Sequence, residues 1–505
     1  MAKQGAVVIG GGIGGMATAA LLGKAGYEVS LYEKNDRLGG KAGKFQEAGF
    51  TFDMGPSWYL MPDVFEHYFK LMGEDISKYI ELTRLTPSYK VFFKESGLKV
   101  EITGDLEKDL PQFEVIEPGV TPRFMEYLAK SEQQYEIAMG SFVYKNYDTV
   151  MDFLTLEAAV KGAKLRVFSK MHTYVERYFK TPEMQKIMEY TLVFLGSSPY
   201  NTPALYSIMT HIDFNMGVFY PKGGIYGIVE ALTKLMDKYG VKYHTGKPTE
   251  EILVEGGRAV GIKLEGGNEV RADVVISNAD RHHTEMVLTP AHYRSIPEKN
   301  WEKKTLAPSA FIMYLGVKGR IPEFTHHNLV FSRNWEENFG QIFGEKKQLP
   351  TDPSYYVCAP SVTDATVAPK GHENLFVLVP IPAGAEVSET WMKVYGDGIL
   401  KDMETNTGIA DLQERIVYCR YYSVEDFTRD YNSFQGTALG LAHTLNQTAI
   451  FRPNNFSKQL KGLYFVGADT NPGIGMPMCL ISAELLLKRL RSDKSAGPLA
   501  EPLTK

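Results

Sequence analysis

The glycine pattern near the start of the chain is the strongest constraint on its fold. Residues 6–9 are apolar and indicate a buried strand, residues 10–15 have the spacing GxGxxG, and residues 16–24 are small and helix-forming. A second apolar strand, residues 29–32, ends at Glu33. Strand, glycine turn, helix, strand and acid in this order predict a βαβ unit that binds a dinucleotide.

Each glycine of the turn has its own physical role. Gly10 permits a tight turn, Gly12 lets the backbone approach a pyrophosphate, and Gly15 lets the helix pack closely on the strand. The helix N-terminus offers N–H groups to the phosphates. Glu33 is placed to accept hydrogen bonds from both ribose hydroxyls, and its charge disfavours a 2′-phosphate, so NADP is not expected. A glycine-rich turn in an ordinary α/β protein is the alternative.

The residues that follow the acid distinguish FAD from NAD. Arg37 precedes a second glycine pair, Gly39 and Gly40, and residues 49–56 supply another strand and another close backbone approach. These residues resemble the extended fingerprint of the glutathione-reductase-like flavoproteins, in which the arginine and the glycine pair lie against the diphosphate of FAD. The resemblance implies FAD as the cofactor and an α/β fold with a glutathione-reductase-like Rossmann FAD-binding domain.

Length and composition narrow the possible functions. At 505 residues the chain exceeds what one core usually supports, so two domains are expected. The net charge of −5, with both signs scattered, provides no basic stripe for nucleic acid. Cys358, Cys419 and Cys479 are widely spaced and form no CxxC or His/Cys pattern, so no metal site is expected. A reducing compartment therefore fits, and thiol-disulfide flavin chemistry does not.

The start of the chain and its hydropathy predict a cytoplasmic protein. The first strand begins within five residues of Met1, which leaves no room for a signal peptide. No apolar run approaches the ~20 residues that a transmembrane helix needs. Any contact with a membrane is therefore expected to be peripheral.

The order of the expected elements predicts a discontinuous division of the chain. Strand-forming and helix-forming segments of mixed character occupy residues 306–429, whereas residues 243–278 form a set of strands with glycine turns. We expect an FAD-binding domain interleaved with a mixed α+β domain that binds substrate and faces a membrane. The FAD-binding domain takes residues 1–85, 218–305 and 430–505, and the substrate domain takes residues 86–217 and 306–429.

A predominantly helical segment, residues 122–217, is rich in aromatic and methionine residues, chiefly within 142–156 and 168–195. A stripe of this kind is more often simple core than the lining of a ligand site. Both interpretations stay open on the pattern alone.

A second glycine-rich loop lies near the end of the chain. Residues 462–467 form a strand that ends on Gly467, and residues 468–475 lead into a helix over residues 476–490. The N-terminus of this helix could present N–H groups to the pyrimidine edge of a flavin and stabilise its reduced form. A loop that merely caps the helix is the alternative.

Motifs along the whole chain point to a narrower resemblance. GGGIGG, RLGGK and FDMGPS near the N-terminus, with PKGG, SNAD, GTALGL and the terminal VGADTNPGIGMP, resemble the bacterial-type phytoene desaturases. These are carotenoid desaturases of the FAD-dependent amine-oxidase-like group. The family usually has Thr-His-Pro-Gly where residues 470–473 are Thr-Asn-Pro-Gly, so the number of bonds and the product do not follow from the resemblance.

The resemblance implies an apolar polyene substrate, phytoene or a close relative, drawn from a membrane leaflet. The implied reaction removes two hydrogens from a C–C bond of the substrate. Repetition of this step along the polyene would lead to a lycopene-type product. The helices of residues 122–217 then become equally good candidates for a tunnel wall, since an apolar ligand needs the same lining as a core. Because the chain lacks a nicotinamide domain, the electrons are expected to pass to an external acceptor, oxygen or a quinone.

The predicted cofactor site combines the two glycine-rich regions. Its members are Gly10, Gly12, Ile13, Gly14, Gly15, Glu33, Lys34, Arg37, Gly39, Gly40, Lys41, Gly55, Pro56, Ser57, Thr249, Gly467, Asp469, Gly475, Met476 and Pro477.

No residue stands out as a catalytic base, because hydride transfer depends more on positioning and on a receptive flavin than on a strong base. Asp469, His443 and Lys222 are the candidates. Each has a structural alternative: a turn-capping carboxylate, a hydrogen-bonded core histidine and a solvated loop lysine. The catalytic group therefore stays unassigned.

Three other functions are compatible with this fold. A redox-neutral carotenoid isomerase would use the same pocket. A flavin amine oxidase would normally build an aromatic cage and often a buried lysine beside the flavin, and neither is identifiable in the sequence. A prenyl-binding escort protein would keep the fold as a binding module, but Glu33, Arg37 and Gly467 favour a retained cofactor.

Overall fold

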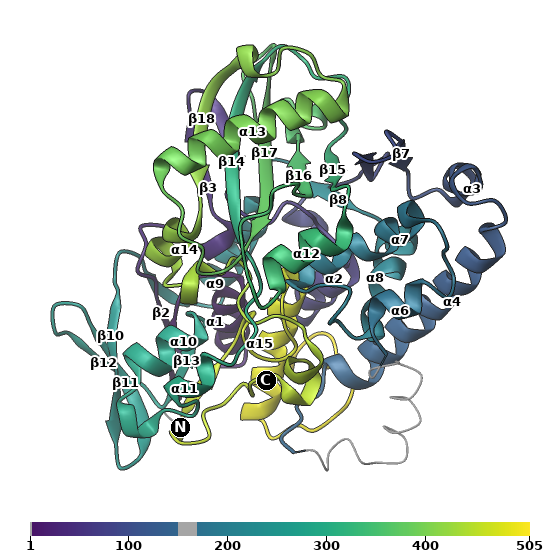
Figure 1. The fold of residues 1–505 in the computed structure, drawn as a ribbon. Helices are drawn as coiled ribbons and strands as arrows, with labels where there is room; N and C mark the ends of the chain where they lie inside the picture. Colours follow the sequence, from purple (N-terminus) through teal and green to yellow (C-terminus); the bar gives the residue numbers. More distant parts are fainter. Residues whose placement is uncertain (1–2, 150–168, 505) are drawn as a thin grey trace.

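The computed structural model describes residues 3–149 and 169–504, which form two large β-sheets, three smaller ones and a helical lobe (Figure 1). The first sheet has five parallel strands in the order β19-β13-β1-β2-β9. Helix α1 (Ile13–Lys24) joins β1 to β2, so the predicted βαβ unit is confirmed. The strands are β1 (Gly5–Ile9), β2 (Glu28–Tyr32), β9 (Lys242–His244), β13 (Val274–Ser277) and β19 (Leu463–Phe465).

Both faces of the parallel sheet are covered. On one face α1 packs against α15 (Met476–Leu490) and α9 (Tyr226–Lys238), while α2 (Pro62–Leu71) contacts α15. Helix α1 is buried almost throughout because it consists of small and apolar residues. On the other face lies a three-stranded antiparallel sheet, whose Ile252 and Ile262 pack against Val7 and Val275. Its strands are β10 (Thr249–Glu255), β11 (Arg258–Leu264) and β12 (Glu269–Arg271).

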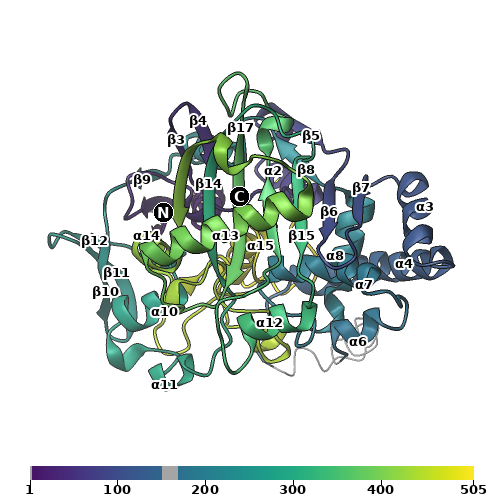
Figure 2. The same cartoon turned by 45° about the horizontal axis from the view of Figure 1, so that its top comes forward.

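The second large sheet has seven strands in the order β18-β14-β17-β16-β15-β6-β7. Neighbours are antiparallel except β15 and β6. Helix α13 (Glu389–Thr407) lies across one face (Figure 2), where Ile399 and Met403 share a core with Phe311. The strands are β6 (Tyr89–Phe93), β7 (Lys99–Ile102), β14 (Ser309–Lys318), β15 (His327–Phe331), β16 (Tyr355–Cys358), β17 (His372–Ile381) and β18 (Ile416–Tyr422).

Helices dominate the described part of residues 122–217, as predicted. They are α4 (Thr121–Ala138), α6 (Met171–Val175), α7 (Pro182–Glu189) and α8 (Ile208–His211), with π-helical turns at Met139–Val143 and Ile212–Met216. Parts of the two predicted aromatic segments, residues 150–156 and Phe168, lie outside the described residues. Helix α3 (Leu106–Ile116) joins this lobe at the right of Figure 1.

Shorter elements complete the described chain. Strands β3 (Lys44–Glu47) and β4 (Phe50–Asp53) form a hairpin, and β5 (Leu82–Arg84) pairs with β8 (Phe219–Pro221). The short helices are α10 (Arg281–His283), α11 (Glu298–Trp301), α12 (Trp335–Phe343) and α14 (Val424–Tyr431).

The two large sheets draw on different parts of the chain but share one core. The five parallel strands come from residues 1–85, 218–305 and 430–505, and the seven strands of the second sheet come from 86–217 and 306–429. The largest hydrophobic cluster nevertheless runs from Ala6 and Leu31 of the first sheet to Ile312 and Phe376 of the second. Two separable domains at the predicted boundaries therefore stay a prediction.

Candidate functional site

A cavity of about 1630 Å³ connects the glycine-rich loops of the first sheet with the inner face of the second. Typical ligand pockets occupy about 300–1,000 Å³. This cavity therefore has room for a dinucleotide and a second ligand.

The first glycine turn lines the cavity through Gly10, Gly12, Ile13 and Gly14. Gly12 is the N-cap residue of α1. Because glycine has no side chain, the cap supplies no hydrogen-bond acceptor to the N–H groups in the first turn of the helix. Gly15 lies behind the turn, where an added Cβ would be 2.1 Å from the carbonyl oxygen of Gly10. The predicted packing role of Gly15 is thus confirmed, and its placement is structural rather than cofactor-lining.

Glu33 and Lys34 line the cavity next to this turn. The buried Glu33 carboxylate accepts the N–H groups of Gly11 at 2.7 Å and Asn35 at 2.8 Å. It therefore shapes the glycine turn in addition to its expected role at the ribose. The Lys34 ammonium donates to the carbonyl of Arg429 at 2.6 Å and to Asn432 Oδ1 at 3.1 Å.

Replacing Glu33 with alanine is expected to weaken FAD retention. Loss of the ribose hydrogen bonds that this buried carboxylate is expected to accept costs about 1–3 kcal/mol, which corresponds to a dissociation constant roughly 5- to 150-fold higher. Titration of the apoprotein with FAD, followed by flavin fluorescence, measures the change. Glu28→Ala, on the exposed side of the same strand, is the control, and equal affinities for the two variants would contradict the assignment.

Two orphaned hydroxyls support a nucleotide in this part of the cavity. Thr249 Oγ1 and Ser433 Oγ are buried, belong to residues that line the cavity, and have no hydrogen-bond partner among the described residues. Buried hydroxyl groups of folded proteins are nearly always paired. A ligand rich in hydroxyl and phosphate groups would satisfy them, so the residues present fit the adenosine half of FAD.

The second glycine-rich loop also reaches the cavity. Gly467, Asp469, Gly475, Met476 and Pro477 line it, and α15 begins there without a side-chain cap. The N-terminus of α15 carries the positive end of the helix dipole, and this positive end suits the electron-rich edge of a flavin ring.

Three charged side chains come together beside this loop. Lys41, Asp280 and Asp469 all line the cavity. Burial, with the nearby Asp469 charge, raises the pKa of Asp280 to about 7. Burial also lowers the pKa of Lys41, an effect that the two carboxylates oppose. In the sequence Asp280 appears only as the last residue of the SNAD motif; its adjacency to Asp469 depends on the neighbouring positions of β13 and β19.

A buried arginine holds the second glycine-rich loop in place. The guanidinium of Arg452 is 1% exposed and donates to the carbonyl groups of Leu441, Ala468 and Thr470 at 3.1, 2.5 and 3.0 Å. A further bond reaches Gln447 at 3.3 Å. No motif marks Arg452 in the sequence, because its importance arises only from carbonyl groups that three separate segments of the chain present to it.

None of the three catalytic candidates is free to act as a base. Asp469 accepts the backbone N–H groups of Leu441 at 3.0 Å and Arg281 at 3.3 Å. His443 Nε2 accepts the N–H of Ile474 at 3.1 Å, and its Nδ1 bonds the Tyr206 hydroxyl. Burial holds the pKa of His443 well below its usual value, so the ring is neutral. Both side chains position loops, which favours their structural alternatives.

Two predicted residues lie away from the cavity. Lys222 is exposed and pairs with Glu81 at 3.0 Å. Arg37 is half exposed, pairs with Asp36 and donates to the Lys44 carbonyl. Lys222 therefore has the position of its structural alternative, a solvated loop lysine, and the contact of Arg37 with the FAD diphosphate stays a prediction. The cavity is lined by Lys41, Gly39, Gly40, Gly55, Pro56, Ser57 and Thr249, whose contacts with FAD also stay predictions.

The remainder of the cavity is an apolar chamber. Tyr190, Phe194 and Met209 from the helical lobe face Leu329 and Phe376 from the second sheet. Other apolar residues of the same lobe, such as Met184 and Met188 of α7, are buried in the core instead. The aromatic segment thus serves both purposes, core and cavity wall.

The chamber wall is backed by a buried carboxyl group. Asp213 accepts hydrogen bonds from the hydroxyls of Tyr89 at 2.7 Å and Tyr190 at 2.9 Å. Burial raises the pKa of Asp213 to about 7.

This raised pKa predicts a loss of stability with rising pH. The stabilising contribution of protonated Asp213 is present below about pH 4, the unfolded value, and is lost as the pH rises through about 7. Between these limits the slope is at most about 1.4 kcal/mol per pH unit. Asp213→Asn, which mimics the protonated group, is expected to show a smaller slope in urea unfolding between pH 5 and 6.5. Equal slopes in both proteins would show that Asp213 ionises normally.

Several known proteins are similar to this chain in sequence or in fold. Residues 13–485 match the model of the family described as flavin containing amine oxidoreductase. The carotenoid 3,4-desaturase of Haloarcula japonica is 48% identical over 489 residues, which cover 96% of this chain and 98% of that protein. The zeta-carotene-forming phytoene desaturase of Myxococcus xanthus is 37% identical over 489 residues, covering 96% and 93%.

A solved structure of putrescine oxidase bound to putrescine superposes with a TM-score of 0.62 at 13% identity, covering 97% of this chain and 99% of that chain. At this identity the likeness shows the fold. The family match and the two full-length sequence matches place the chain in the flavin containing amine oxidoreductase family, in the group that contains these two carotenoid desaturases.

Proposed function

We propose that this protein is an FAD-dependent carotenoid desaturase, which removes hydrogens from C–C bonds of a polyene of the phytoene type and extends its conjugation. The observation that carries the proposal is the continuity of one cavity from both glycine-rich loops into an apolar chamber. The names of the full-length relatives, a carotenoid 3,4-desaturase and a phytoene desaturase, support the same substrate class.

In this proposal FAD, when bound, supplies the hydride acceptor. The chain holds the cofactor through the two helix N-termini and the polar groups around Glu33, and it keeps the flavin-facing loop rigid through Arg452 and Asp469. The apolar chamber excludes water and aligns an extended hydrocarbon. No side chain is assigned as the base that accepts the proton. In this proposal the positioning of the hydrocarbon against the cofactor accounts for the catalysis.

In this proposal the electrons pass to an external acceptor, which is oxygen or a quinone. Rapid reduction of the flavin by NADPH alone would contradict this route, since it would reveal a nicotinamide site.

We further propose that the cavity opens onto a membrane surface. Leu445 and Phe451 line the cavity yet are 40% and 57% exposed, which is where an apolar substrate could enter from a leaflet. None of the helices in the described ranges has both the length and the apolar character needed to cross a bilayer.

Phe451→Ser is expected to reduce binding to liposomes roughly tenfold or more, because inserting a large apolar side chain contributes about 1.5–3 kcal/mol. Co-sedimentation with vesicles measures the effect. Val394→Ser is the matched control: Val394 is 68% exposed but lies on α13, on the opposite side of the second sheet from the chamber. Equal binding by both variants would contradict a membrane-facing mouth.

The reaction itself is tested by anaerobic incubation of the holoenzyme with liposomes that carry phytoene or a longer-conjugated polyene. Bleaching of the flavin together with polyene absorption at longer wavelength is expected, and the preferred polyene then defines the substrate. If the flavin is never bleached, but the prereduced enzyme isomerises a coloured polyene, the isomerase alternative replaces the proposal.

A further inference from the structure

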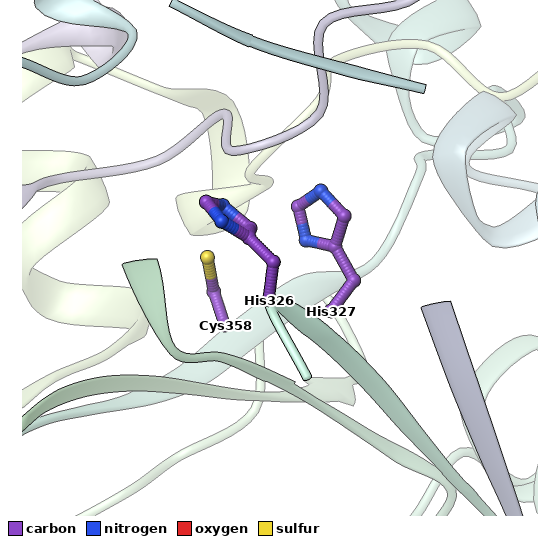
Figure 3. Close-up of side chains that lie close together, drawn as sticks. All are labelled: His326, His327 and Cys358. Carbon is purple, nitrogen blue, oxygen red and sulfur yellow. The ribbon is translucent and has the colours of Figure 1, made fainter. Parts of the chain in front are cut away.

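Three side chains with metal-binding chemistry meet outside the large cavity (Figure 3). They are His326, His327 and Cys358, whose potential ligand atoms all lie within 4.8 Å of one another. His327 begins β15 and pairs directly with Cys358 at the end of β16, which puts both side chains on one face of the sheet. The three residues are 2%, 0% and 4% exposed.

Two buried nitrogens in this cluster have no hydrogen-bond partner within residues 3–149 and 169–504. Each ring is held through Nδ1: His326 bonds Thr363 Oγ1 at 2.8 Å and His327 bonds the Tyr356 hydroxyl at 2.6 Å. The Nε2 atoms of both rings are buried and unpaired. Such orphaned groups are rare in native proteins, and a bound ligand is one physical explanation.

The protonation states suit metal binding. Burial lowers the pKa of His326 to about 3 and that of His327 well below its usual value, so both imidazoles are neutral and can donate a lone pair. Burial also raises the pKa of Cys358 to about 12, so the thiol is protonated until a metal displaces its proton.

A small second cavity adjoins the cluster. It has a volume of about 20 Å³ and is lined by His326 and Cys358 together with Asp53. A space of this size holds about one water molecule. It offers a fourth coordination position beside three protein ligands.

We propose that His326, His327 and Cys358 bind one d¹⁰ metal ion, Zn²⁺ or Cu⁺, with water from the small cavity as a possible fourth ligand. Nitrogen and thiolate ligands suit these ions better than Mg²⁺ or Ca²⁺. Binding requires the ligand atoms to close to about 3.5 Å apart, as metal–ligand distances of 2.0–2.3 Å demand. The Cys358 thiol releases one proton to solvent, and no electron is transferred.

The site would stabilise the wall of the substrate chamber. The His327 ring stacks on Trp58 with centroids 4.0 Å apart and bonds Tyr356. Trp58 and Tyr356 both line the large cavity. The metal is therefore assigned a structural role, separate from the electron transfer of the proposed reaction.

Elemental analysis of the tag-free holoenzyme, after exposure to Zn²⁺ or Cu⁺ and dialysis, tests the proposal. About one ion per chain is expected, with release of one proton per Zn²⁺ bound. Cys358→Ser and His326→Ala are expected to lose the ion. Cys419→Ser, which removes an exposed thiol on β18, is the control and is expected to retain it. FAD content shows whether each variant has folded.

Replacing the bound ion with Co²⁺ allows absorption spectroscopy to detect the Cys358 thiolate ligand in the unmodified protein. A thiolate-to-cobalt charge-transfer band and d–d bands beyond the flavin absorption are expected in the unmodified protein. Absence of a stoichiometric ion and of these bands in that protein would overturn the proposal, as would retention of the ion by a folded Cys358→Ser variant.

Discussion

The Gly15→Ala variant is expected to purify almost free of FAD. The added Cβ would lie 2.1 Å from the Gly10 carbonyl oxygen and 3.1 Å from the Asn278 Cβ. Backbone atoms cannot rotate away as a flexible side chain can, so α1 must move relative to β1. Overpacking of this kind costs typically about 1–3 kcal/mol, and the shift also displaces the N–H groups that face the phosphates. The flavin absorbance per chain and the melting temperature measure both effects.

Gly227→Ala is the matched control for this substitution. Gly227 also lies in the first turn of a helix, α9, but an added Cβ there has no atom within 4 Å. We expect full FAD occupancy and a gain of about 0.5–1 kcal/mol, because alanine is the better helix former. Full FAD occupancy in Gly15→Ala would contradict the close approach of α1 to the turn.

Arg452→Leu is the second substitution expected to have a large effect. It leaves the carbonyl groups of Leu441, Ala468 and Thr470 buried without their donor. The loss is expected to destabilise the protein by about 3–5 kcal/mol and to release FAD, because residues 468–475 lose their anchor. Urea unfolding and flavin content measure the two consequences.

Two further variants separate hydrogen bonding from charge. Arg452→Lys keeps the positive charge but has fewer, differently directed donors, so an intermediate stability is expected. Arg271→Leu removes an exposed arginine that pairs with Glu255 and Glu269, and it is expected to cost less than about 1 kcal/mol. Native stability and flavin content in Arg452→Leu would show that the loop does not depend on this guanidinium.

Local patterns predicted the nucleotide-binding unit and the second glycine-rich loop. A turn that needs glycine, a helix that starts directly after it and an acid at the end of the next strand are determined by residues close in the sequence. The same reasoning did not predict that Arg37 and Lys222 lie outside the cavity lining, because the direction of a long side chain depends on partners such as Asp36 and Glu81.

Residues that act across distant segments carried no recognisable pattern. Arg452 matters because separate turns aim carbonyls at it, and Asp280 because parallel pairing puts β13 beside β19. His326 and His327 join Cys358 only through the register of β15 with β16. Spacing along the chain contains no information about such a register.

The fold class, the FAD-binding unit and the resemblance to carotenoid desaturases could be predicted from the amino-acid sequence, because these depend on short motifs with strict local geometry. Which aromatic residues line the chamber and which fill the core became clear only from the three-dimensional structure. The physical reason is that both environments select the same apolar side chains; they differ only in whether the packing of distant helices and strands leaves a cavity between them.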